Sequence, residues 1–169
     1  VFSRSREGLE HPDLQLLYAP VTFEPDQKNM LESKPGMAVA ICPTRPDSRG
    51  TIMISSPDPM QHPAIRPNYL SAESDLHVLL AGIKQTRKIF AAPAMAEFSE
   101  GEIRPVVPIE TIDDARKIAQ ESGTTIYHPV GTCKMGEDPM AVVDSRLRVN
   151  GVTNLRVIDA SVMPVLTTG

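Results

Sequence analysis

The chain has 169 residues, enough for one domain, and a chain of this size buries roughly 70% of its unfolded surface. Its 17 Lys and Arg are outnumbered by 21 Asp and Glu, aromatic residues make up only 4%, and Trp is absent. Binding to nucleic acid depends on clustered basic residues or on aromatic stacking platforms. The composition therefore argues against a nucleic-acid partner.

Two cysteines, Cys42 and Cys133, are too few for a disulfide framework or a four-cysteine zinc site. We expect both thiols to be free in a reducing compartment and predict the cytoplasm, with peripheral membrane association of a parent protein left open. No apolar stretch reaches the ~20 residues of a membrane-spanning helix. Because the chain starts without Met and neither end has a terminal signature, we expect it to be a piece of a longer protein.

In chain order, the first half predicts several short strands. Apolar patterns favour strands over residues 14–18 and 37–42, and the polar stretch 22–35 between them is typical of an exposed loop. Turn residues at 46–50 lead into a further strand over 51–55. We expect this strand to pair antiparallel with residues 37–42.

Two helices follow. Residues 71–92 place apolar side chains at helical spacing, with Ser71 or Ser74 as the expected N-cap. Residues 112–122 form the second predicted helix, which begins after the N-cap Thr111. Short strands with two good helices and long loops indicate an α+β fold.

His128 lies in the sequence YHPVGTCKMG, residues 127–136. Since Pro129 follows, the backbone at His128 is expected to be extended, and the glycines of the segment allow close approach to another surface. An imidazole on such a segment can act as a general base, and a structural role of a lone loop histidine is the alternative. Cys133 is five residues away, but no further ligand lies at metal-binding spacing, so we predict no metal site.

Asp159 follows the segment LRVI, residues 155–158, which predicts a strand, and precedes the small residue Ala160. Residues 144–152 are likewise typical of a strand and a turn. An aspartate at the carboxyl end of a strand can hold a nucleotide-like ligand, although an ordinary strand-to-loop junction is the simpler interpretation. The chain contains no G-x-G-x-x-G and no Walker loop, so it has no dinucleotide-binding fingerprint of its own.

Several blocks in this order resemble the C-terminal part of the glucose–methanol–choline (GMC) oxidoreductases, in the choline dehydrogenase-like and related bacterial alcohol dehydrogenase branch. The resemblance extends over residues 12–169. It is carried by RPDSRGTIMISSPDP (45–59), PAIRPNYLS (63–71), YHPVGTCKMG (127–136) and GVTNLRVIDASVMP (151–164).

The resemblance implies an antiparallel sheet with helices on one face. Residues 1–140 would form a substrate-binding domain, and residues 141–169 would return to an FAD-binding domain. It also implies oxidation of an alcohol, choline-like or another primary alcohol, to an aldehyde. His128 would accept the hydroxyl proton while hydride passes to the flavin, and Asp159 and Ala160 would contact FAD.

Two parts of the family pattern lie outside this sequence: the glycine-rich FAD-binding half and an Asn-containing motif that follows the position of residue 169. Without them a base has no hydride acceptor and no fixed geometry. We therefore expect the chain alone to bind no FAD and to be inactive. Self-association through a face that the missing FAD-binding domain would cover is left open as a third hypothesis. A non-catalytic binding module with the same fold is the alternative.

Overall fold

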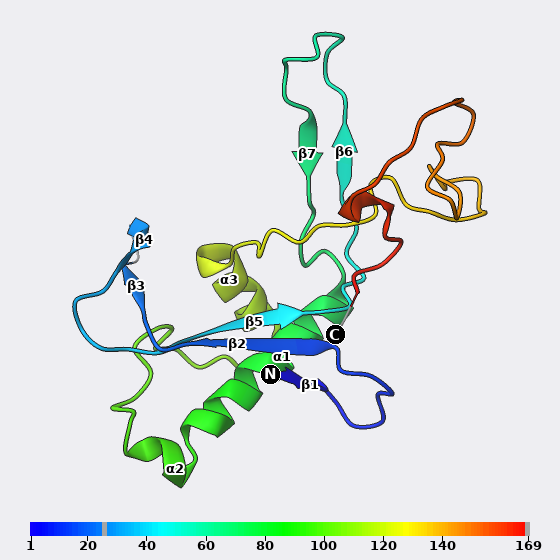
Figure 1. Cartoon of the computed structure of the whole chain (residues 1–169). Helices are drawn as coiled ribbons and strands as arrows, with labels where there is room; N and C mark the ends of the chain where they lie inside the picture. Colours follow the sequence, from blue (N-terminus) through cyan, green and yellow to red (C-terminus); the bar gives the residue numbers. More distant parts are fainter. Residues whose placement is uncertain (25–26, 168–169) are drawn as a thin grey trace. The chain divides into compact units, whose positions relative to one another are not determined.

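The computed structural model describes residues 1–24 and 27–167, except for the side chains of residues 27–29. Short antiparallel strands and a few helices make up the chain, as the predicted α+β class requires (Figure 1). The chain divides into two compact units. Unit 1 comprises Val1–Pro46 and Ala72–Ser122, and unit 2 comprises Asp47–Ser71 and Gly123–Gly169. The functional boundary expected at residue 140 stays a prediction.

Unit 1 is built on a three-stranded antiparallel sheet in the order β1–β2–β5. These strands are β1 (Phe2–Ser3), β2 (Leu14–Ala19) and β5 (Ala38–Pro43). The predicted strands over 14–18 and 37–42 are thus confirmed, but they pair with each other, with Leu16 opposite Ile41. The predicted pairing of 37–42 with 51–55 is wrong.

Residues 51–53 do not pair with β5 because the connection after β5 leads them to a different partner. A Cβ atom at Gly50 would overlap the backbone carbonyl oxygens of Arg66 and Pro67, so any residue with a side chain is excluded at this position. In unit 2, β6 (Thr51–Met53) then pairs with β7 (Ala64–Arg66). Local turn chemistry correctly indicated a break at 46–50, but the partner of β6 comes later in the chain.

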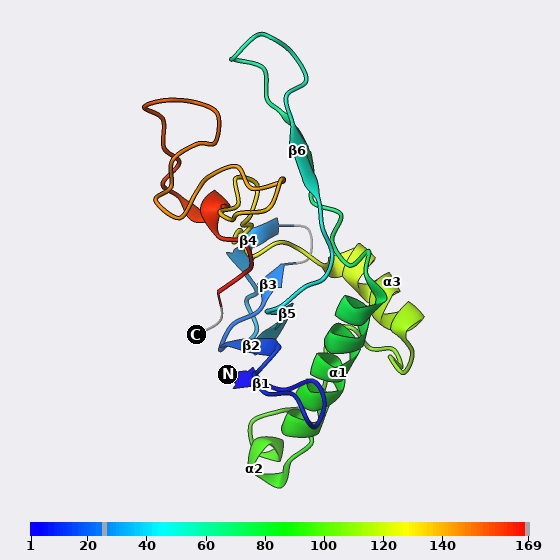
Figure 2. The same cartoon turned by 90° about the vertical axis from the view of Figure 1, so that its right-hand side faces the viewer.

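The first helix of unit 1 covers one face of the sheet, and the two later helices pack against that helix (Figure 2). These helices are α1 (Glu73–Phe90), the short α2 (Pro93–Ala96) and α3 (Ile112–Ser122), so both predicted helices are confirmed. Thr111 and Asp114 form a reciprocal capping box, in which the Asp114 N–H donates to Thr111 Oγ1 at 3.2 Å. None of the described helices is long and apolar enough to cross a membrane.

The N-cap of α1 differs from the prediction. Ala72 occupies the N-cap position, so neither Ser71 nor Ser74 is the cap residue. The hydroxyl of Ser71 instead accepts a hydrogen bond from the side-chain amide of Asn68 at 3.0 Å. Glu73 and Asp75 remain in the first turn, where negative charge complements the helix dipole.

The core of unit 1 fills the space between the sheet and the helices. Gly82 lets α1 lie directly on β2 and β5, because a Cβ there would overlap Ile41 Cγ2 and lie 2.9 Å from Leu14 Cδ1. The other core positions are apolar side chains that are almost completely buried: Leu14, Leu16, Leu76, Ile83, Ile109 and Ala115. The apolar face predicted for α1 therefore faces the sheet, and the apolar face of α3 packs against α1.

The expected loop over residues 22–35 is also corrected. It contains the hairpin β3 (Phe23–Glu24) and β4 (Gln27–Leu31), although residues 25–26 lie outside the described part of the chain. Glu32 follows the hairpin and accepts hydrogen bonds from the Thr22 hydroxyl, at 2.7 Å, and from Arg104. Thr22 first, and Arg104 next, hold the pKa of Glu32 below its usual value. A polar composition therefore concealed strands that side-chain partners stabilise.

Unit 2 has little regular structure beyond β6 and β7. Three isolated bridges, between residues 135 and 143, 143 and 149, and 148 and 156, hold its remaining loops, and Val143 is fully buried among them. The predicted strand over 155–158 is wrong, because only Arg156 makes a bridge there. A short 3-10 turn, η1 (Ala160–Val162), follows.

Candidate active site

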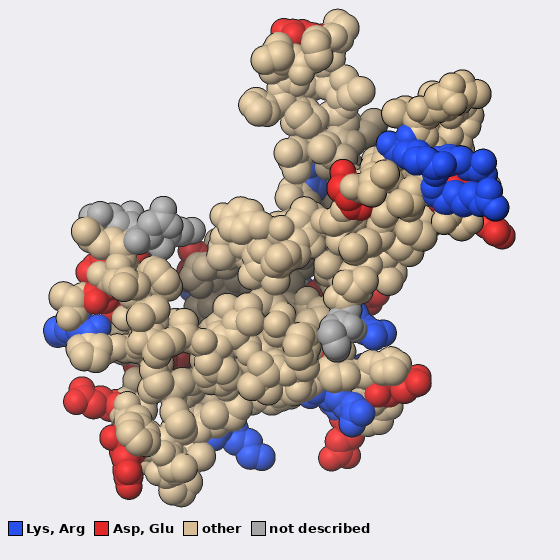
Figure 3. Space-filling view, in the orientation of Figure 1, with Lys and Arg blue, Asp and Glu red and all other residues tan. Residues whose placement is uncertain are grey.

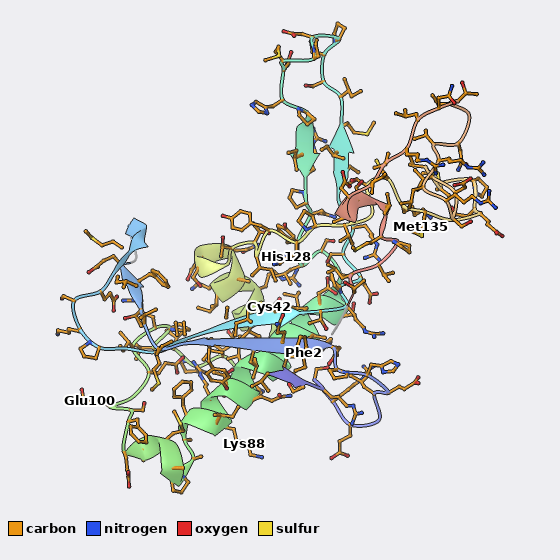
Figure 4. The ribbon with its side chains drawn as sticks, viewed as in Figure 1. Phe2, Cys42, Lys88, Glu100, His128 and Met135 are labelled. Atoms are coloured by element: carbon orange, nitrogen blue, oxygen red, sulfur yellow. The ribbon has the colours of Figure 1, made fainter. Side chains whose placement is uncertain are left out.

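His128 lies in unit 2, in a segment that contains no helix or strand (Figure 4). Its side chain is exposed, and no hydrogen bond or ion pair joins it to the described residues. Tyr127 before it has φ 62°, a left-handed backbone that is unfavourable for a bulky residue. The imidazole is therefore presented to the surface, and neither ring nitrogen has a partner within residues 1–24 and 27–167.

The segment that carries His128 is hydrogen-bonded to the segment that carries Asp159 and Ala160. The Cys133 N–H donates to the Ser161 carbonyl at 3.0 Å, and the Met135 N–H donates to the Val162 carbonyl at 2.8 Å. The structure thus joins two stretches that are far apart in the sequence and that hold all the predicted site residues.

Gly131 makes this close approach feasible. Its φ is 87°, and a Cβ atom at this position would lie 3.3 Å from the Met163 carbonyl oxygen. A side chain at residue 131 would be both strained and crowded, so glycine is required here. This agrees with the close-approach role expected for the glycines of this segment.

The carboxylate of Asp159 is used within its own turn. Asp159 is the N-cap of η1, and its Oδ1 accepts a hydrogen bond from the Ser161 N–H at 2.8 Å. Hydrogen bonds from the side chain and backbone of Ser161 lower the pKa of Asp159. Ala160 is exposed, so the turn presents backbone and a methyl group at the surface.

Sequence reasoning missed the turn that Asp144 organises, where a strand was expected. Asp144 Oδ1 accepts hydrogen bonds from the N–H groups of Arg146 and Arg148, at 2.9 and 3.0 Å, and Oδ2 accepts from Arg148 Nε at 2.8 Å. An Asp followed by a Ser, with an Arg four residues after the Asp, is the signal that indicates such a turn. The arginines of this loop form the blue patch at the upper right of Figure 3.

Hydrogen bonds from Arg148 lower the pKa of Asp144 to about 2, from the ordinary 3.8 of an aspartate. Since the carboxylate is favoured in the folded turn, its contribution to stability is present above pH 4 and is lost as the pH falls toward 2. A carboxyl NMR titration is expected to give a midpoint near 2 for Asp144. In the Arg148→Ala variant the midpoint should rise toward the ordinary value, and an unchanged midpoint would contradict the assigned cause.

Both thiols are free, as predicted. Cys42 is buried, and desolvation raises its pKa, whereas Cys133 is half-buried. Across the described ranges, no group of three His, Cys, Asp and Glu side chains is arranged to hold a metal ion.

The sequence profile of the GMC oxidoreductases matches residues 46–169, and the chain belongs to this family. It is 42% identical over 168 residues to the alcohol dehydrogenase (acceptor) of Pseudomonas putida and to the oxygen-dependent choline dehydrogenase of Cronobacter sakazakii, covering 99% of this chain and 30% of each relative. The structure of pyridoxine 4-oxidase from Mesorbium loti is similar with a TM-score of 0.85 and 31% identity, over 99% of this chain and 33% of that one.

The resemblance inferred from the sequence blocks is therefore confirmed, and so is the fold that it implied. The chain spans about 30% of the length of these curated relatives.

Proposed function

We propose that this chain is the substrate-side part of an FAD-dependent oxidoreductase that converts an alcohol, choline-like or another primary alcohol, to an aldehyde. The observation that carries the proposal is an exposed His128, without a partner in the part of the chain that the structure describes, on a segment hydrogen-bonded to the Asp159–Val162 turn. FAD, the cofactor of the family, would supply the acceptor for the hydride.

The chain's own contribution is a proton acceptor. A ring nitrogen of His128 would take the hydroxyl proton of the alcohol, which leaves the O–H electron pair on the oxygen. That pair forms the C=O bond as the carbon loses hydride with the C–H electron pair. Because this imidazole has no partner among the described residues, no existing hydrogen bond has to be broken before it accepts the proton. The restricted backbone between Tyr127 and Pro129 supports a fixed orientation.

The surface around η1 fits contact with FAD and with the FAD-binding domain of the same polypeptide. Asp159 is engaged in its own turn, and Ala160 leaves room for a flat group to approach the backbone. Tyr127, Ile158 and Val165 in the same unit are 80%, 74% and 61% exposed, although they are large and apolar. Such exposure supports a face that is covered in the complete protein.

The proposal is tested on the full-length polypeptide, purified with its flavin. Anaerobic addition of a primary alcohol or choline is expected to bleach the visible flavin band. A flavoprotein that none of these alcohols reduces would contradict the proposal and favour the non-catalytic binding module.

The isolated chain provides the matching control. Incubated with FAD it should take up no flavin and oxidise no alcohol, and light scattering should detect self-association through the uncovered face. Acquired flavin absorbance would contradict the inactivity of the chain alone.

The free Cys42 and Cys133 thiols support a reducing compartment such as the cytoplasm.

A further inference from the structure

We propose that Thr125, held by Tyr69, is a positioning residue that fixes the backbone leading into His128. This inference rests on the proposed role of His128 as proton acceptor. Neither Thr125 nor Tyr69 is assigned a contact with substrate, since both act through the backbone of Tyr127.

The hydroxyl oxygen of Thr125 accepts two hydrogen bonds at once. One comes from the Tyr127 N–H at 3.0 Å and the other from the Tyr69 hydroxyl at 3.0 Å. A threonine oxygen has two acceptor sites, so both are used. Thr125 therefore ties the residue next to His128 to a segment more than fifty residues earlier in the chain, within the same unit.

Tyr69 is itself held in a constrained turn. Its neighbours Asn68 and Leu70 have φ values of 54° and 55°, both in the left-handed region. The Asn68 side-chain amide donates to the Arg49 carbonyl and to the Ser71 hydroxyl, each at 3.0 Å. The tyrosine hydroxyl is thus presented to Thr125 from a turn whose conformation is stabilised by side-chain hydrogen bonds.

The Tyr127 backbone is the point at which this support is needed. With φ at 62°, an aromatic residue is in an unfavourable conformation that persists only when neighbouring groups hold it. Within residues 1–24 and 27–167, Thr125 is the side chain that hydrogen-bonds the Tyr127 N–H. If Tyr127 relaxed to an ordinary conformation, the chain direction at His128 would change and the imidazole would move away from its alignment.

The test uses the full-length flavoprotein and the Thr125→Val variant, which keeps the side-chain shape and removes the oxygen. Hydrogen–deuterium exchange read on overlapping peptides should show faster exchange of the Tyr127 amide. Flavin reduction at saturating alcohol should slow by about 10–100-fold, the scale expected for a misplaced catalytic group, with little change in the substrate dissociation constant. Thr125→Ser should restore both, and Tyr69→Phe should give an intermediate effect.

Thr153→Val is the matched control, because Thr153 is an exposed threonine of the same unit. Unchanged flavin reduction in Thr125→Val, despite faster exchange at Tyr127, would overturn the positioning role. Equal loss in Thr125→Ser and Thr125→Val would overturn it too, since serine retains the acceptor oxygen. If His128→Ala reacts like the unaltered enzyme, the proposed function fails, and faster exchange in Thr125→Val then marks Thr125 as structural only.

Discussion

Replacement of His128 by Ala in the full-length flavoprotein is expected to slow alcohol-dependent flavin reduction by about 10²–10⁴-fold, the usual contribution of a positioned general base. The hydroxyl proton would then have to leave to water, while flavin content and the visible spectrum of the oxidised enzyme should stay the same. Stopped-flow absorbance under anaerobic conditions measures the reduction step directly and separates it from reoxidation.

His62→Ala is the matched control for this measurement. His62 is exposed and lies in unit 2, between β6 and β7, and its backbone carbonyl rather than its ring accepts a hydrogen bond from Ser55. We expect a reduction rate within twofold of the unaltered enzyme, a margin of about 0.4 kcal/mol in barrier height. A His128→Ala rate as high as that of His62→Ala would show that His128 is not the proton acceptor.

Leu16→Ala is expected to destabilise the chain by about 2–5 kcal/mol, because truncating a buried leucine removes apolar contacts and leaves a cavity. Leu16 is 1% exposed and lies opposite Ile41, on the face of the sheet that α1 covers at Gly82. Urea unfolding of the purified chain, followed by far-UV circular dichroism, measures the change without relying on tryptophan fluorescence.

Leu17→Ala tests whether the loss in unfolding free energy depends on which face of the sheet the truncated leucine occupies. Successive strand residues point to opposite faces, and Leu17, which is 41% exposed, faces away from the helices. We expect less than half the loss in unfolding free energy seen for Leu16→Ala. Equal losses for the two variants would show that the open face of the sheet is covered in solution and would contradict the one-sided packing.

The sequence by itself determined the elements whose signals are local. The apolar spacing of α1 and α3 predicts helices because side chains three and four residues apart share one face. For α3, the predicted N-cap Thr111 adds a second local signal. The short apolar runs of β2 and β5 predict strands because each is only a few residues long and is bounded by turn residues. The motif blocks around His128 and Asp159 indicated the GMC family, because their residue types recur at fixed spacing.

Only the tertiary structure decided which strands pair and which site residues meet. β5 joins β2 rather than β6 because strand pairing depends on contacts between residues far apart in the chain. The turn at Asp144 is different, since its hydrogen bonds come from Arg146 and Arg148 and are local. The Thr125–Tyr69 hydrogen bond and the hydrogen bonds that join residues 133 and 135 to η1 also link residues far apart in the chain, so no local pattern predicts them. A sequence pattern reports which face of an element is apolar, whereas the partner of that face is set by packing between segments far apart in the chain.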